Sequence, residues 1–158
     1  DMIKLRRASG KDCKLIWEWA NDPDVRAVSF SQEAIVYENH IKWFETKLDD
    51  SDCYFYIAED SQQGSIGQIR FELKGHEAYI SISLDRKFRG QGHGSEIIAI
   101  ASKAFLESTD AEIIHAYIKK ANTASFAAFK KAGFSTEKNL LIKNQAVHHL
   151  ILTRKDVS

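Results

Sequence analysis

The sequence predicts an α/β (α+β) fold in which helices flank a mixed, mostly antiparallel central sheet. Runs of alternating apolar and polar residues, typical of half-buried strands, are interspersed with runs whose apolar residues recur at helical spacing. Most successive strand-like runs are joined by short turns, which connect antiparallel neighbours. The chain of 158 residues contains no linker, repeat or low-complexity tract, so we expect a single domain over residues 1–158 with one core.

The N-terminal third combines one strand with two helices. Ile3–Arg7 alternates like an edge strand, and Lys11–Ala20 places its large apolar residues at helical spacing. Asn21–Asp24 predicts a turn, because proline fixes φ and Asn and Asp side chains bond the nearby backbone. The spacing of apolar residues predicts a second helix over Val36–Leu48.

Strands and two further helices fill the rest of the chain. Three strands joined by short glycine-containing turns and then a helix are expected at Tyr54–Glu59, Ser65–Leu73, Glu77–Leu84 and Ser95–Leu106. A strand, a short helix and a hairpin that turns at Asn144–Gln145 follow, at Glu112–Ile118, Thr123–Ala132, Leu140–Lys143 and Ala146–Leu152.

The composition points to small ligands. The 22 basic residues balance the 22 acidic ones, so the sequence offers no electrostatic footprint for nucleic acid or for an anionic membrane. No apolar run approaches membrane-spanning length and no signal peptide is recognisable, so we expect a cytoplasmic protein. Cys13 and Cys53 lack metal-ligand spacing. We therefore expect reduced, structural cysteines and no metal site.

The most informative stretch is Arg89–Gly94, which reads Arg-Gly-Gln-Gly-His-Gly and lies between a predicted strand and a predicted helix. Three glycines in five positions let the backbone turn tightly and bring several N–H groups to one anion. The helix that follows adds the positive end of its dipole. The stretch predicts a phosphate site, although a plain strand-to-helix turn would have the same residues.

A second segment, Asn122–Phe134, adds an asparagine that opens a short helix and a Gly-Phe pair that ends it. Together the two segments resemble the Gcn5-related N-acetyltransferase (GNAT) superfamily, whose Arg/Gln-x-x-Gly-x-Gly/Ala signature is matched at Arg89, Gly92 and Gly94. The resemblance extends from the first strand to the final hairpin. It implies the GNAT fold and an acetyl-CoA-dependent N-acetyltransferase, an acyltransferase that acetylates an amine.

The resemblance also implies a set of cofactor contacts. The amides of residues 89–95 would hold the pyrophosphate, the end of the preceding strand would offer backbone groups to the pantetheine arm, and the short helix would add further contacts. These residues are Arg89, Gly90, Gln91, Gly92, His93, Gly94, Ser95, Ile82, Leu84, Asn122, Phe126, Phe129 and Lys130. Two alternatives stay open: Asn122 is also a good helix cap, and the two phenylalanines have the spacing of core residues.

Catalysis is harder to assign, because Phe129 stands where many GNAT enzymes have a tyrosine that protonates the departing thiolate. Tyr117 and His115 alternate on one predicted strand and therefore share a face. A histidine suits a base near neutrality, and a tyrosine can donate the proton. Both are also ordinary sheet residues. Further candidates for lining the acceptor cavity are Tyr79, Ser83, Gln68 and Glu72.

The acceptor should be recognised by the N-terminal third, which resembles nucleotide-sugar N-acetyltransferases of the pseudaminic acid type. On the second helix His40 and Trp43 lie beside a predicted core stripe, Ile41, Phe44 and Leu48, and would contact a uridine nucleotide. Arg26 is a candidate for the diphosphate. The alternative is that His40 and Trp43 only cover the sheet.

The expected substrate is thus a small-molecule amine, in particular the 4-amino group of a UDP-linked amino-dideoxy sugar. That family often has arginine where this chain has Ala20, so the match is incomplete. A ribosomal-protein N-terminus or an aminoglycoside is an alternative acceptor, and a non-catalytic CoA-binding module is an alternative of another class. An exposed final strand would allow a homodimer.

Overall fold

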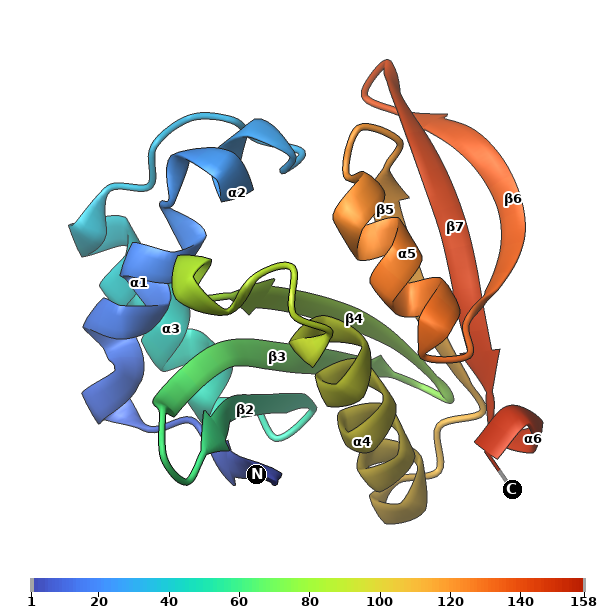
Figure 1. Ribbon diagram of the computed structural model, residues 1–158, viewed down its shortest axis with the longest axis horizontal. Helices are drawn as coiled ribbons and strands as arrows, with labels where there is room; N and C mark the ends of the chain where they lie inside the picture. The colour runs from blue at the N-terminus through green and yellow to red at the C-terminus, as the bar shows by residue number, and fades with distance from the viewer. Residues whose placement is uncertain (1, 158) are drawn as a thin grey trace.

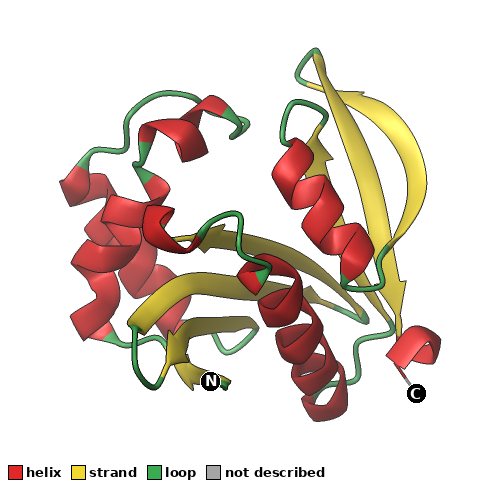
Figure 2. Ribbon diagram, in the orientation of Figure 1, coloured by secondary structure: helices red, strands yellow, loops and turns green. Residues whose placement is uncertain are grey.

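The computed structural model describes residues 2–157 and contains one sheet of seven strands in the order β1-β2-β3-β4-β5-β7-β6 (Figure 1). All neighbouring strands are antiparallel except β4 and β5, which are parallel. Helices lie on both faces of the sheet (Figure 2). The predicted fold class is therefore confirmed.

The elements follow the predicted order. The strands are β1 (Ile3–Arg7), β2 (Cys53–Asp60), β3 (Gly64–Lys74), β4 (Glu77–Leu84), β5 (Ile113–Lys119), β6 (Ser135–Ile142) and β7 (Gln145–Thr153). The α-helices are α1 (Cys13–Ala20), α2 (Pro23–Ala27), α3 (Tyr37–Asp49), α4 (His93–Ser108), α5 (Thr123–Lys131) and α6 (Arg154–Val157). Two short 3₁₀ turns, η1 (Gly10–Asp12) and η2 (Arg86–Phe88), complete the set.

The hydrophobic core is divided by the sheet. On one face α4 and α5 pack on the central strands, where Ile98 of α4, Phe129 of α5 and Ile69 of β3 belong to one buried cluster. On the other face α1 and α3 pack on β2, where Trp19, Phe44 and Ile57 belong to a second, smaller cluster. Because alternate strand residues point to opposite faces, each side chain of β4 is assigned to one layer or the other.

Strands β4 and β5 form a fork. They pair over only three residue pairs, from Glu77 with Ile113 to Tyr79 with His115. Beyond this point β4 still pairs with β3 as far as Leu84, and β5 still pairs with β7 as far as Lys119. Each strand therefore keeps one unpaired edge that faces the fork, and Figure 1 shows the two arms diverging.

The predicted turn at Asn21–Asp24 is the beginning of α2 rather than a simple turn. Pro23 is the first helical residue, and the Asp22 carboxylate accepts the N–H of Asp24 at 2.9 Å. Proline and aspartate are favoured at helix N-termini for the same reasons as in turns, so the sequence alone did not separate the two.

The final hairpin differs from the prediction in three ways. Strand β6 begins at Ser135 and not at Leu140, and the turn residues are Lys143 and Asn144, with φ of 51° and 64°. Positive φ at both positions is the geometry of a tight two-residue hairpin. The last strand, β7, lies between β5 and β6, so it has no exposed edge with which a second copy could pair.

Both cysteines are free thiols, and burial raises the pKa of the Cys53 thiol to about 11. Within residues 2–157, no helix is long and apolar enough to cross a membrane.

Gly67 controls the approach of β3 to the end of β4. A Cβ added there would lie 2.6 Å from the Ser83 carbonyl oxygen and 2.8 Å from Leu84 Cδ2. We therefore predict that Gly67→Ala lowers the free energy of unfolding by about 1–3 kcal/mol, because the two strands must move apart. Urea unfolding would measure the change. Gly10→Ala is the control, since a Cβ at Gly10 meets nothing within 4 Å, and equal stability of the two variants would contradict the argument.

Candidate functional site

A cavity of about 670 Å³ lies between the end of β4, the glycine loop with the start of α4, and α5. Its lining includes Ile82, Leu84, Arg89 and Asn122, all of which were predicted to contact the cofactor. Residues of α2 and the segment after it complete the wall. The cavity therefore lies against the unpaired edge of β4.

The glycine loop presents a row of free backbone donors. Among residues 2–157, no hydrogen-bond acceptor pairs with the six N–H groups from Gly90 to Ser95. Gly90 and Gly92 have φ of 73° and 85°, a conformation that residues with a Cβ rarely adopt. Helix α4 begins directly after Gly92. Successive free amides at a helix N-terminus suit a phosphate group, so this part of the cavity fits the pyrophosphate of CoA.

Asn122 caps α5 and also lines the cavity. Its Oδ1 accepts the N–H of Ser125 at 3.2 Å and so caps α5. Its Nδ2 has no partner among the described residues, and the side chain lines the cavity. The cap fixes the amide so that its donor is left for a peptide-like arm such as pantetheine.

Five of the predicted cofactor residues turn their side chains elsewhere. Phe129 is buried against Phe134, and Phe126 lies against the ring of His148, so neither lines the cavity. On α5 the cavity is lined by Ala124, Ala128 and Lys131 instead, so the cation beside it is Lys131 and not Lys130.

In the loop, the side chains of Gln91 and His93 also point away from the cavity. Gln91 Nε2 donates to the carbonyl of Lys87 at 2.9 Å, and the ring of His93 lies edge-on to Phe88. Only the backbone of these two residues remains available for the predicted contact.

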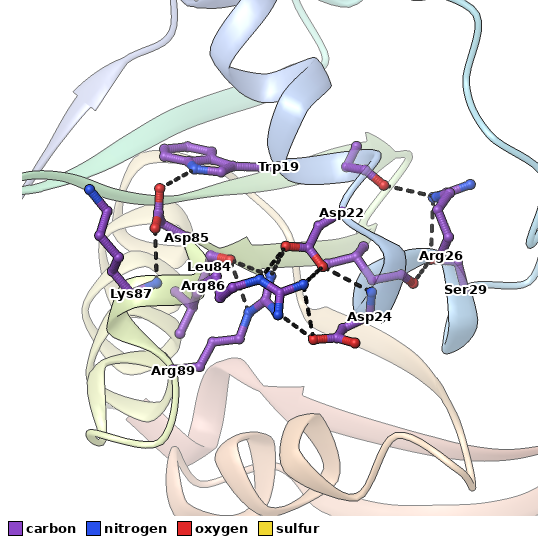
Figure 3. A network of polar contacts seen from close by, with 12 residues as sticks. Trp19, Asp22, Asp24, Arg26, Ser29, Leu84, Asp85, Arg86, Lys87 and Arg89 are labelled. Atoms are coloured by element: carbon purple, nitrogen blue, oxygen red, sulfur yellow. Dashed lines mark hydrogen bonds and ion pairs between the residues drawn. The ribbon is translucent and has the colours of Figure 1, made fainter.

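A polar network joins α2 to the glycine loop (Figure 3). Arg89 Nη2 donates to the carbonyl of Leu84 at 3.1 Å, which ties the loop to the end of β4. The same guanidinium lies 3.4 Å from the carboxylate of Asp22 and 3.6 Å from that of Asp24. Arg86 adds ion pairs to both aspartates, at 3.0 and 3.3 Å. The predicted phosphate loop is thus held against the start of α2.

The second cavity, of about 440 Å³, lies between α1–α3 and the face of β3 and β4 opposite α4. Its charged lining residues are Arg26 and Arg70, and no aspartate or glutamate of residues 2–157 lines it. Trp43, 36% exposed, lies under the Arg70 guanidinium at 5.0 Å. The two cavities share Val25, Ser29, Ile82 and Ser83 and therefore adjoin.

His40 and Arg26 line this cavity but are already engaged. His40 is 3% exposed, packs on Phe44 and bonds the carbonyl of Cys13 through Nε2 at 2.8 Å, so it belongs to the core stripe and not to an adjacent face. Burial lowers the pKa of His40, which keeps it neutral. Arg26 donates to the carbonyls of Ala20 and Ser31 at 2.8 and 2.9 Å, so its first role is to close the loop after α2.

Tyr117 and His115 share a face of β5, as predicted, and lie where β5 separates from β4, but neither lines either of the two cavities. Both nitrogens of His115 are bonded, Nε2 to the Glu77 carboxylate and Nδ1 to His149 Nε2 at 2.7 Å. Since the carboxylate accepts from His115 Nε2–H, Nδ1 must accept from His149, and His149 Nδ1 is left buried without a partner in the described chain. His115 therefore cannot take a proton directly without losing a bond.

The two tyrosines of the fork are part of a stack of rings. Tyr79 stacks on His115 at 5.1 Å and Tyr117 stacks on His149 at 4.5 Å. Burial, helped by the nearby Tyr79 and Glu77, raises the pKa of Tyr117, so its hydroxyl keeps its proton near neutrality. A protonated hydroxyl at the fork fits the predicted role of proton donor.

The other acceptor candidates fall into two groups. Gln68 and Ser83 line the second cavity and are bonded to each other, with Gln68 Nε2 donating to Ser83 Oγ at 2.7 Å. Glu72 lies outside it, where Lys47 and Arg70 pair with its carboxylate. Arg70, Glu77, Lys131 and His149 could not be recognised as site residues in the sequence, because the pattern of a single strand or helix does not show which polar side chains will come into contact.

Known proteins resemble this chain in sequence and in fold. A family model described as an acetyltransferase (GNAT) domain matches residues 3–135. The structure of the aminoglycoside acetyltransferase AAC(6')-Ib with ribostamycin and coenzyme A is similar, with 16% identity, a TM-score of 0.86, and 99% of this chain and 96% of that chain covered. The spermidine N-acetyltransferase from Vibrio cholerae with CoA and spermine is similar too, with 16% identity, a TM-score of 0.89, and 98% and 97% covered. A comparison with the curated proteins gives no match.

Gly94 tests the larger cavity, because its φ is ordinary for a helix and a Cβ there would lie 3.5 Å from Ala128 Cβ and 3.7 Å from Leu84 Cδ1. We predict that Gly94→Val leaves folding almost intact but weakens CoA binding by about tenfold or more, since the branched side chain narrows the space between α4 and α5. Calorimetric titration with CoA measures the affinity, and Gly94→Ala should give a smaller loss. A folded Gly94→Val variant with unchanged affinity would show that CoA binds elsewhere.

Proposed function

The chain belongs to the acetyltransferase (GNAT) family, and we propose that it transfers the acetyl group of acetyl-CoA to the 4-amino group of a UDP-linked amino-dideoxy sugar. The larger cavity takes the donor, and the smaller cavity takes the acceptor. The two adjoin at Ile82 and Ser83, so a donor and an acceptor bound in them would meet at the fork.

The charge of the smaller cavity carries the choice of acceptor. Its charged residues are two arginines, and none of the described residues lining it is acidic. Neither Nη group of Arg70 has a hydrogen-bond partner in residues 2–157, since only its Nε donates to Glu72. A diphosphate suits such a guanidinium, whereas a polycationic amine would be repelled. Trp43 offers a ring for the base.

The residues around the larger cavity match the parts of CoA. The free amides from Gly90 to Ser95 receive the pyrophosphate, and the unpaired edge of β4 at Ile82 and Leu84 receives the amides of the pantetheine arm. When bound, acetyl-CoA supplies an acetyl group activated as a thioester. The protein orients this group toward the smaller cavity.

The transfer needs two proton movements. The amine nitrogen forms a bond to the acetyl carbon and loses a proton to solvent or to a nearby base, and the C–S bond breaks with its electron pair going to sulfur. Tyr117 donates its phenolic proton to that sulfur and recovers it from solvent, since the side chain is 36% exposed. Glu77 and His149 hold the rings beside it through their bonds to His115.

A cationic acceptor is the main alternative. The similar solved structures include an aminoglycoside acetyltransferase and a spermidine acetyltransferase, but at 16% identity these establish the fold alone. The two arginines of the smaller cavity would repel such a cationic acceptor.

We predict that the protein releases CoA fastest with a UDP-4-amino sugar when it is compared with kanamycin, spermidine and a short peptide. Trp43→Ala should raise the KM for the UDP sugar by about tenfold, because stacking on a base contributes about 1–3 kcal/mol. The KM for acetyl-CoA should not change. A thiol-release assay measures both constants.

Two outcomes would contradict the acceptor assignment. Efficient turnover of kanamycin or spermidine without turnover of the sugar would favour a cationic acceptor. Inhibition by free UDP that competes with acetyl-CoA instead of the sugar would place the nucleotide in the wrong cavity. The matched control is Trp17→Phe, since the Trp17 indole bonds the carbonyl of Ile35 and does not line the smaller cavity.

A separate prediction concerns the proton donor. Tyr117→Phe should lower kcat by about 10²-fold with little change in either KM, since general acid catalysis is worth about 10²–10⁴-fold. Tyr79→Phe is the control, because Tyr79 belongs to the same stack but lies on β4, in its last residue pair with β5. Steady-state kinetics with both variants decide the matter, and full activity of Tyr117→Phe would remove this residue from the mechanism.

A further inference from the structure

The point of reaction is defined by the residues common to both cavities, which are Val25, Ser29, Ile82 and Ser83. This inference rests on the proposed function in one respect: the larger cavity holds acetyl-CoA and the smaller one holds the amine. The acetyl carbon must then lie where the two cavities adjoin. A polar group at this place is in position to act on the carbonyl that reacts.

Only Ser83 among the four has a hydroxyl proton to offer. The Ser29 hydroxyl donates to the carbonyl of Val25 at 2.6 Å and accepts from Arg26 Nη2 at 3.2 Å. Val25 and Ile82 have apolar side chains. Ser83 Oγ instead accepts a hydrogen bond from Gln68 Nε2 at 2.7 Å, and its proton has no acceptor in residues 2–157.

Gln68 sets the direction of the Ser83 hydroxyl. The two residues are directly opposite each other on β3 and β4, and Gln68 is 6% exposed. Because the glutamine supplies the N–H, the serine oxygen is the acceptor, and its O–H must point elsewhere. The Oε1 of Gln68 is buried without a partner among the described residues. A buried unpaired oxygen destabilises a fold, so packing alone does not account for a glutamine at this position.

We propose that Ser83 donates its hydroxyl hydrogen bond to the carbonyl oxygen of the acetyl thioester and that Gln68 is its positioning residue. As the amine nitrogen bonds to the carbonyl carbon, negative charge grows on that oxygen, and the bond from Ser83 strengthens. The oxygen returns to a carbonyl when the C–S bond breaks and the electron pair leaves with sulfur. The serine gains and loses no proton in this sequence.

The first test compares Ser83→Ala with Ser65→Ala. Ser65 lies on β3 and lines neither cavity, so it is the control. Ser83→Ala should lower kcat by about 10²-fold, the size of effect that one such donor has, with less than a twofold change in the KM for acetyl-CoA. Ser65→Ala should keep kcat within about twofold. Equal kcat for wild type and Ser83→Ala would overturn the proposal.

The second test needs no acceptor. The carbonyl resonance of acetyl-CoA labelled with ¹³C at the carbonyl should shift downfield on binding to the wild type, because a hydrogen bond polarises the carbonyl. Ser83→Ala should return it upfield. Gln68→Glu should do the same, because the introduced carboxylate accepts the Ser83 proton and turns the hydroxyl away. Ser81→Ala should leave the resonance in place, because Ser81 is on the same face of β4 as Ser83 but lines the smaller cavity only.

These outcomes separate the two proposals. If the carbonyl resonance moves as expected but the UDP sugar is not acetylated, only the acceptor assignment fails. A resonance that is the same in Ser83→Ala and wild type overturns the role of Ser83, whichever amine is the substrate. Failure of the wild type to bind acetyl-CoA overturns it as well. Should Gln68→Glu not fold, the Ser83→Ala comparison decides alone.

Discussion

Strands β4 and β5 separate after three residue pairs, and the larger cavity lies along the edge of β4 that this separation leaves unpaired. A strand edge that is left unpaired inside a protein must find hydrogen-bond partners elsewhere, or it destabilises the fold. Two bonds hold the segment after α2 across the arms: Lys119 Nζ donates to the carbonyl of Ser29, and Gln145 Nε2 donates to that of Phe30, each at 3.2 Å. Both bonds join the segment after α2 to the β5–β7 arm. The edge of β4 therefore stays available for a peptide-like ligand.

The polar network in Figure 3 fixes the position of α2, which borders both cavities, relative to the glycine loop. Partly exposed ion pairs such as those of Arg86 contribute little stability each, roughly 0–1 kcal/mol. Together, however, these ion pairs fix α2 against the glycine loop, and one of their partners, Asp22, is also the N-cap of α2. Asp24 places a negative charge on the wall of the larger cavity, beside Arg89. A pyrophosphate on the loop would compete for that arginine, so donor binding and the position of α2 are electrostatically coupled.

Backbone chemistry was the part of the site that the sequence could reveal. Glycine at positive φ and asparagine at a helix cap are requirements of the local chain, and Gly90, Gly92 and Asn122, which were predicted to contact the cofactor, line the larger cavity. The orientation of a helix is set by tertiary packing, which a short amphipathic run does not specify. On α5 the apolar spacing suggested Phe126 and Phe129, but both rings face the core or β7, and small alanines line the cavity.

Pairing between distant strands could not be predicted from the sequence for a similar reason. The first residues of β6 are polar and exposed and show no alternation, so only their pairing with β7 makes them a strand. The chain Glu77–His115–His149 and the pair Gln68–Ser83 likewise join residues on different strands. The Gln68–Ser83 pair is uncharged and lies wholly on the β3–β4 arm. The other chain runs from Glu77 on β4 to His115 and His149 on the β5–β7 arm. Burial and the neighbouring His115 lower the pKa of His149, so its imidazole stays neutral at physiological pH and the lone pair at Nδ1 persists.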